Sequence, residues 1–237
     1  MDVASEPRDQ LEGGAAAGFR AAAEAQYGLA RLVTLSVPYG QEWVDTTLLR
    51  FLRARGGDEA AALVMIGQAL ELRAQEKLDT ILDRPLPTVV IQHLHASYDE
   101  GWLPRPDRVG RPVYLLRGGR TGERLERLFS APAAGMDWAL SDVTEAFIHN
   151  HLQMMEYLNK VIFRQHTEAA KGRTINKFVL VNDLSGMGTQ GVAQIMKFAD
   201  IMKRMAAVDQ LLYPEGLGVP PPLNTYQSKT RCCNIFR

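Results

Sequence analysis

The sequence lacks several features that mark particular classes of protein. Its 237 residues include only two cysteines, the neighbours Cys232 and Cys233, and adjacent cysteines rarely form a disulfide with each other. No histidine or further cysteine lies close to this pair, so the spacing gives no sign of a zinc site. The sequence therefore predicts no disulfide framework and a reduced, cytoplasmic protein.

An excess of charge and long apolar runs are also missing. There are 27 lysines and arginines and 27 aspartates and glutamates, so the formal net charge is zero and indicates neither a nucleic-acid partner nor strong attraction to an anionic membrane. No uninterrupted apolar run approaches the ~20 residues that a membrane-spanning helix needs. The stretch 1–14 has acidic residues and no apolar segment, so we expect it to be disordered and not a secretory signal.

The first third of the chain is rich in helix signals. Residues 1–40 form an N-terminal extension whose alanine-rich part, 15–35, favours one helix. Residues 41–84 are predicted to form a helical hairpin, because capping residues, a glycine pair and an apolar stripe occur in the right order. These markers are the N-caps Asp45 and Asp58, the terminating pair Gly56-Gly57, and the stripe Leu63, Ile66 and Leu70.

The stretch 85–218 alternates strand and helix patterns, which predicts an α/β fold. One strand is expected over 111–117 and another over 175–182. The second run is apolar on both faces, which is typical of a central strand in a buried parallel sheet. Ser141 is expected to cap a long helix, and a further unbroken helix is expected over 192–212.

Gly186, Gly188 and Gly191 match the dinucleotide-binding pattern G-x-G-x-x-G between a predicted strand and a predicted helix. In such a site the first glycine lies tight against the strand end, whereas Asp183 intervenes here and would place a negative charge near the phosphates. No second strand ending in an acidic residue follows about 20 residues later. We therefore expect the glycines to allow a tight bend, and a nucleotide-dependent oxidoreductase remains an alternative.

The other chemistry-bearing residues predict neither catalysis nor a metal site. His149 and His151 are two residues apart on a predicted helix and so face different ways. No nucleophile elbow or phosphate-binding loop is present. The basic residues of one helix are expected to form a solvated face rather than a phosphate site, because acidic neighbours are at hand. The basic set is Arg50, Arg53 and Arg55, and the expected partners are Asp58, Glu59 or Glu71.

Three blocks, in this order, resemble the CRAL-TRIO lipid-binding family. They are Leu-Leu-Arg-Phe-Leu-Arg-Ala-Arg (48–55), Gly-Arg-Pro-Val-Tyr (110–114), and Asn-Asp-Leu-Ser-Gly (182–186) continued through a helix to Tyr-Pro-Glu (213–215). The resemblance covers about residues 42–218. It implies a small N-terminal helical subdomain (41–84) followed by an α/β lipid-binding domain (85–218), with a hydrophobic ligand held between a sheet floor and a mobile gating helix.

The resemblance also implies ligand contacts. In members that transfer phosphatidylinositol, the matching arginine and glutamate serve the inositol phosphate; here they are Arg55 and Glu215, but the lysine that follows the arginine is replaced by Gly56. Members that hold phosphatidylcholine have hydroxyls at the positions where this chain has Phe178 and Leu180. Methionines of the C-terminal half are expected to fill the core or line an adaptable cavity. The predicted lipid-binding residues are Arg55, Tyr114, Phe178, Leu180, Met196 and Glu215.

The length of the chain departs from the family pattern. After Tyr-Pro-Glu the family continues with a further strand, the gating helix and more of the sheet floor. This chain instead has a divergent tail over 219–237 that includes three consecutive prolines, which exclude a central strand. We therefore expect an incomplete, C-terminally truncated CRAL-TRIO domain.

These observations predict a non-enzymatic protein without a cofactor. It is expected to bind a phospholipid or other hydrophobic lipid and to transfer it between membranes. Its partners are then that lipid and, transiently, a membrane surface, with no nucleic acid, and its location is cytoplasmic and peripheral to membranes. The alternative from another class is a degenerate CRAL-TRIO fold that docks a protein partner and carries no lipid.

Overall fold

The structure is a computed structural model that describes residues 14–36, 43–97, 100–130, 140–170, 174–185 and 188–216. The expectations for 1–13, for Gly186 and for the tail 219–237 lie outside these residues. The chain folds as two compact units, and each is described by itself. The first unit comprises Met1–Asp83, Glu156–Asn176 and Ala207–Gly216, and the second contains Arg84–Met155 and Lys177–Ala206.

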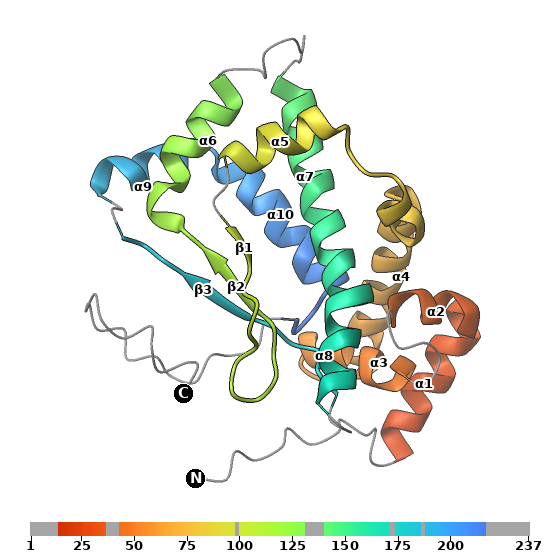
Figure 1. Ribbon diagram of the computed structural model, residues 1–237. Helices are drawn as coiled ribbons and strands as arrows, with labels where there is room; N and C mark the ends of the chain where they lie inside the picture. The colour runs from red at the N-terminus through yellow and green to blue at the C-terminus, as the bar shows by residue number, and fades with distance from the viewer. Residues whose placement is uncertain are drawn as a thin grey trace. The chain divides into compact units, whose positions relative to one another are not determined.

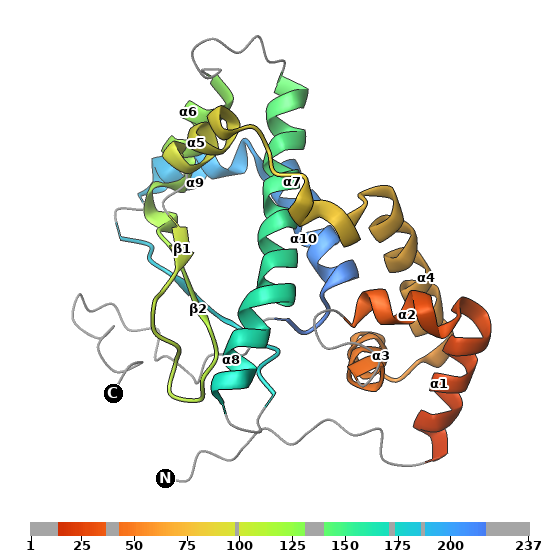
Figure 2. The same cartoon turned by 45° about the vertical axis from the view of Figure 1, so that its right-hand side comes forward.

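The first unit is helical and begins with α1 (Gly14–Tyr27) and α2 (Leu29–Leu35). The prediction of one helix over 15–35 is wrong, because Gly28 has a φ of 78°, in the left-handed region that glycine adopts without steric cost, and breaks the helix there. Figure 2 shows these two helices grouped with α3 (Val44–Ala54) and α4 (Glu59–Gln75). The side chains of Phe19, Leu32, Phe51 and Ile66 from the four helices are almost fully buried.

The hairpin of α3 and α4 follows most of its sequence signals. Helix α3 ends at Ala54, and Gly56 and Gly57 follow with φ values of 62° and 89°, which confirms the predicted stop. The Asp58 carboxylate accepts a hydrogen bond from the Ala61 N–H at 2.9 Å, as expected of an N-cap. The predicted N-cap role of Asp45 is wrong, because α3 already begins at Val44 and the Asp45 carboxylate pairs with Arg20 of α1.

One long helical run crosses the middle of the chain. It consists of α7 (Leu140–Tyr157), a π-helical turn (Leu158–Ile162) and α8 (Phe163–Ala169). Ser141 lies inside α7 and not before it, so the predicted cap at this residue is wrong. The last two residues of α7 belong to the first unit, where they meet a buried ionic network that is described below.

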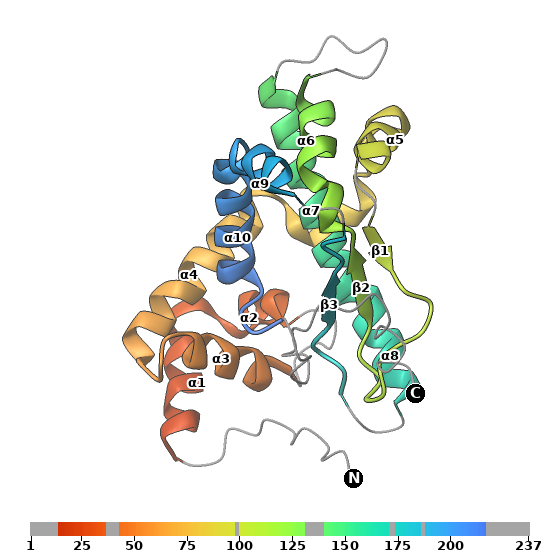
Figure 3. The same cartoon turned by 90° about the vertical axis from the view of Figure 1, so that its left-hand side faces the viewer.

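The second unit contains a sheet of three short strands, β1 (Glu100–Trp102), β2 (Val113–Leu116) and β3 (Val179–Asn182). Strand β2 lies between the other two, antiparallel to β1 and parallel to β3 (Figure 3). The predicted central position of β3 is therefore wrong within the described residues, where β3 is an edge strand and its Leu180 is 38% exposed. Apolar residues on both faces of a strand show that the segment is hydrophobic, but they do not determine how many strands pair with it.

Strand β3 is also shorter than its apolar run of residues. The backbone N–H of Ile175 donates to the Thr167 hydroxyl of α8 at 2.9 Å, and that hydroxyl donates to the Ile175 carbonyl at 3.3 Å. A side chain of α8 thus satisfies the backbone groups that a longer strand would have paired with a neighbour. As a result, the ladder with β2 begins only at Val179.

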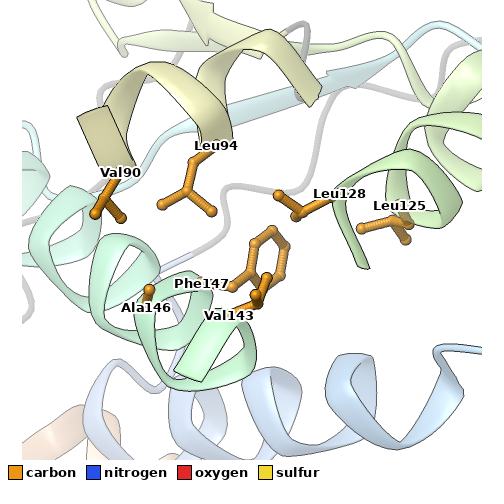
Figure 4. Close-up of a cluster of buried hydrophobic side chains, with 7 residues drawn as sticks. All are labelled: Val90, Leu94, Leu125, Leu128, Val143, Ala146 and Phe147. Carbon is orange, nitrogen blue, oxygen red and sulfur yellow. The ribbon is translucent and has the colours of Figure 1, made fainter. Parts of the chain in front are cut away.

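Helices of the second unit enclose a cluster of apolar side chains. Beside part of α7 they are α5 (Thr88–Ser97), α6 (Thr121–Ser130) and most of α10 (Ala199–Leu212). Helix α9 (Thr189–Met196) runs side by side with α6 (Figure 1). Figure 4 shows the buried cluster contributed by α5, α6 and α7. Its members are Val90, Leu94, Leu125, Leu128, Val143, Ala146 and Phe147.

The unbroken helix predicted over 192–212 is wrong, because α9 ends at Met196 and α10 starts at Ala199. Phe198 lies in this break and packs against the buried cluster. Its ring stacks on Phe129 with 5.1 Å between the ring centroids. The break between α9 and α10 thus coincides with the packing of Phe198. The helical spacing of apolar residues continues across the break, so the sequence pattern did not predict it.

Candidate functional site

The sheet of the second unit gathers three of the predicted lipid-binding residues. Partners in a ladder point to the same face, so Tyr114 shares its face with Trp102 on β1 and with Leu180 on β3. Phe178, two residues before Leu180, lies on this face as well. The Trp102 ring is edge-on to Tyr114 at 4.7 Å and to Phe178 at 5.6 Å between centroids. We call Trp102, Tyr114 and Phe178 the aromatic face.

Sequence reasoning missed Trp102, which contacts both other rings of the aromatic face. Strand β1 has three residues and is followed by prolines, so it carries no alternating pattern that would have identified it. The Gly-Arg-Pro-Val-Tyr block that leads into β2 offered one signal. A hairpin partner of β2 must lie close to it in the sequence, so a strand just before or after the block could have been expected.

Glu100 lies on the same face of the sheet, at the start of β1. Alternation along β1 places it on the side of Trp102, and the Tyr114 hydroxyl hydrogen-bonds its carboxyl group. Burial raises the pKa of Glu100 to about 7, although the Tyr114 hydrogen bond and the positive charge of His151 on α7 favour the ionised form. A carboxyl group that titrates near neutral pH therefore adjoins the aromatic face.

This shift predicts a pH-dependent stability. The folded state keeps a proton on Glu100 that the unfolded chain, with the ordinary pKa of 4.5, releases at lower pH. The free energy of unfolding should therefore fall as pH rises from 4.5 to about 7, by about 3 kcal/mol in total. Thermal melts between pH 4.5 and 8 measure this. Glu100→Gln should remove the decline, and Glu126→Gln, at a side chain that is 41% exposed, should keep it. An unchanged slope in Glu100→Gln contradicts the assignment.

Met196 is a predicted contact that lies on a helix and not on the sheet. It ends α9 and is 65% exposed, and the neighbouring apolar residues Val192 and Leu184 are 48% and 54% exposed. Met196 therefore does not fill the core, which was one of the two expectations for methionines of this half. Its contact with a lipid remains a prediction.

The other two predicted contacts, Arg55 and Glu215, lie in the first unit. Arg55 is exposed in the turn after α3. Glu215 has a φ of 58° and pairs with Arg53, whose Nη2 lies 2.6 Å from Oε2 and whose Nε donates to the same oxygen at 2.8 Å. Arg50 donates to the Asn176 carbonyl at 2.9 Å. The expected pairing of this basic face with sequence neighbours is thus wrong for Arg53, because a distant turn supplies its carboxylate.

A buried ionic network holds the Tyr-Pro-Glu turn in the first unit. Glu156 at the end of α7 is 1% exposed and accepts from Arg73 Nη1 of α4 at 2.8 Å and from the Tyr213 hydroxyl at 2.7 Å. Lys160 Nζ, in the π-helical turn, lies 3.2 Å from the second carboxylate oxygen. Burial and the Glu156 carboxylate raise the pKa of Tyr213 well above its ordinary value, so its phenol stays a donor at neutral pH.

The glycine motif contributes close packing. A Cβ on Gly122 of α6 would lie 2.6 Å from the Gly191 carbonyl oxygen of α9, and a Cβ on Gly119 would overlap the Ser185 carbonyl. Gly188 has an extended backbone with φ −100°, and a Cβ there would meet nothing within 4 Å. The Gly191 backbone of the motif thus packs closely on α6, whereas Gly188 has open space around it.

This packing predicts opposite results for two glycine substitutions. Gly119→Ala should lower the melting temperature by several degrees, because a backbone carbonyl has to move. Gly188→Ala should leave it nearly unchanged, and titration calorimetry of the wild type with NAD or NADP should give no heat above dilution. Saturable micromolar binding that Gly188→Ala removes would restore the dinucleotide hypothesis.

In the part of the chain that the structure describes, the histidines form no metal site and the helices form no membrane span. His93 Nε2 lies 3.4 Å from the Leu128 carbonyl and His149 Nε2 lies 3.4 Å from the Arg84 carbonyl. Within the described ranges no group of three or more His, Cys, Asp or Glu side chains is placed to hold a metal ion. No helix among them has the length and hydropathy to cross a bilayer.

A search against protein-family models found none that matches the chain. A comparison with known proteins did find relatives. The chain is 29% identical over 180 residues to CRAL-TRIO domain-containing protein T23G5.2 of Caenorhabditis elegans, covering 73% of this chain and 21% of that protein. It is 29% identical over 179 residues to phosphatidylinositol/phosphatidylcholine transfer protein SFH9 of Arabidopsis thaliana, covering 72% and 27%.

A fungal relative covers more of its own length. The SEC14 cytosolic factor of Kluyveromyces lactis is 26% identical over 188 residues, which are 77% of this chain and 55% of that protein. The chain thus spans between about a fifth and just over half of the length of these three relatives.

Proposed function

We propose that this chain, which belongs to the CRAL-TRIO family, binds a hydrophobic lipid and takes part in its transfer between membranes without catalysing a reaction. The names of two relatives describe phosphatidylinositol/phosphatidylcholine transfer proteins. The partners in this proposal are a lipid and, transiently, a membrane surface, and no nucleic acid. The whole protein of each relative is longer than the matched region, so the activity is carried to this chain as a proposal.

The aromatic face is the observation that carries the proposal. Three rings from three neighbouring segments of one sheet pack edge-on at 4.7 and 5.6 Å, beside a leucine that remains 38% exposed. Aromatic side chains offer large, rigid apolar surfaces. Each methylene group that a lipid chain buries against such a surface contributes about 0.8 kcal/mol. Tyr114 and Phe178 are already only 7% and 8% exposed, so a ligand would gain this energy chiefly by covering Leu180.

The lipid in this proposal is weakly polar and is not phosphatidylcholine. Phe178 and Leu180 stand where the family resemblance implies hydroxyls for a choline lipid, and Phe178 packs on Trp102. The inositide contacts are also incomplete, because Gly56 replaces a lysine and Glu215 is paired with Arg53. A buried phosphate diester without cationic donors is costly, whereas a neutral lipid needs none.

Two measurements on the full chain test the function. Mass spectrometry of organic extracts of the purified protein should find a bound neutral lipid, such as a sterol, a tocopherol-like phenol or a fatty lipid. Competitive transfer of labelled lipids between liposomes should favour that lipid over phosphatidylcholine. Selective phosphatidylcholine transfer that survives Arg55→Ala would overturn the ligand preference. A monodisperse protein that carries no lipid and transfers none would instead favour the protein-interaction alternative.

A further inference from the structure

The loop that joins β1 to β2, residues 103–112, is organised by a buried aspartate. The Asp107 carboxylate accepts hydrogen bonds from the backbone N–H groups of Val109 at 3.1 Å and Arg111 at 2.8 Å, and it pairs with the Arg111 guanidinium at 2.8 Å. The side chain of Asp107 is 8% exposed and that of Arg111 is 12% exposed. The loop forms a hairpin tip that extends past the ends of the two strands (Figure 2).

This fold of the loop leaves two other arginines at the surface. The Gly110 N–H donates to the Asp107 carbonyl at 3.0 Å, which closes a β-turn with Arg108 at its first corner, and Gly110 has a φ of 90°. Arg105 lies between two prolines, which restrict its backbone. Arg105 and Arg108 are exposed, and within the described ranges neither side chain has an ion pair or a hydrogen bond.

The loop concentrates positive charge in a chain whose net charge is zero. It contains three arginines and one aspartate, and the aspartate compensates Arg111. The charges of Arg105 and Arg108 therefore remain uncompensated, whereas an exposed arginine such as Arg204 of α10 pairs with Glu145. The tip of the loop thus attracts anions, although the neutral composition of the whole chain gives no sign of it.

The chemistry of the tip favours phosphate groups at a membrane surface. A guanidinium group binds phosphate oxygens through charge-assisted hydrogen bonds. Residues 103–112 include no aromatic side chain on which a nucleic-acid base could stack, so the loop lacks the second element of a single-stranded nucleic-acid site. A protruding tip with cationic and proline side chains can instead meet the headgroups of a bilayer, where each basic residue near an anionic surface adds to the attraction.

We propose that Arg105 and Arg108 bind the phosphate groups of acidic phospholipids, so that the β1–β2 loop docks the second unit on an anionic membrane surface. The inference rests on the proposed function in lipid transfer, and it names the class of membrane lipid and the segment that contacts it. Each arginine should raise the partition coefficient onto an anionic membrane about fivefold. Salt should weaken this binding, because the two charges are exposed.

Flotation of the full chain with two kinds of vesicle tests this inference. One kind consists of phosphatidylcholine alone, and the other of phosphatidylcholine mixed with phosphatidylserine. The wild type should bind the mixed vesicles more tightly at low ionic strength, and Arg105→Gln combined with Arg108→Gln should lower that partition coefficient by about 25-fold. The control combines Arg31→Gln with Arg127→Gln, which removes the same charge from exposed arginines on α2 and α6 and should keep most of the binding.

The outcomes separate this inference from the lipid function. Equal partition of the wild type onto both kinds of vesicle, or equal binding by the loop variant and the control, overturns the role of the loop. Displacement from the mixed vesicles by inorganic phosphate at constant ionic strength, or tighter binding to single-stranded RNA, overturns the membrane as the partner. Lipid in the organic extract without a preference for phosphatidylserine leaves only the lipid function standing. A chain that carries and transfers no lipid, yet needs both arginines to bind the mixed vesicles, leaves only the membrane contact.

Discussion

Val179→Asp is expected to unfold the second unit, with a loss of more than about 4 kcal/mol in the free energy of unfolding. Val179 is 3% exposed, and its ladder partner Val113 is fully buried. Its backbone N–H already donates to the Pro112 carbonyl at 2.9 Å, so the strand cannot turn the new carboxylate outward without losing that bond. A charge without a partner in this position is one of the most destabilising single changes.

The neighbouring residue supplies the control for this prediction. Leu180→Asp introduces the same side chain on the opposite face, where the leucine is 38% exposed, and should cost far less. Circular dichroism melts and the yield of soluble protein compare the two variants. If Val179→Asp melts at the temperature of Leu180→Asp, the burial of this strand face is wrong.

The parts of the fold that the sequence predicts well depend on local chemistry. The stop at Gly56 and the cap at Asp58 each involve backbone within about one helical turn, so spacing alone identifies them. The break at Phe198 coincides with stacking on Phe129, far away in the sequence, and helical periodicity carries no information about that contact. The break at Gly28 is different, because the glycine was visible in the sequence and the alanines around it suggested an unbroken helix.

The sequence likewise predicts some residues of the candidate site and misses others. Tyr114 and Leu180 lie on two strands with clear apolar patterns, and pairing those strands places them on one face. Glu100 and Trp102 come from a strand of three residues that has no periodic signal. Helical spacing proposes partners only three or four residues away, whereas Arg53 finds Glu215 at a separation of 162 residues. Long-range pairs of this kind become visible only in the folded chain.

Glu156→Gln is expected to destabilise the first unit by about 3–5 kcal/mol. The carboxylate is 1% exposed and compensates Arg73, which is 5% exposed, while the other partner of Arg73, Asp79, is 58% exposed. Removal of the charge leaves a guanidinium buried without sufficient compensation. The comparison variant is Glu145→Gln, whose ion pair with Arg204 has side chains that are 62% and 48% exposed. An exposed pair of this kind contributes less than about 1 kcal/mol.

A double substitution separates the network's contribution to stability from its role in holding the turn. Replacing both partners, Arg73→Leu with Glu156→Leu, removes the buried charges together and should cost less than either single change, because no uncompensated charge remains. The double variant still loses the acceptor of the Tyr213 hydroxyl, which lies two residues before Glu215. Chemical denaturation of the four proteins gives the coupling energy. Additive losses would show that Arg73 and Glu156 act independently, which contradicts the buried ion pair.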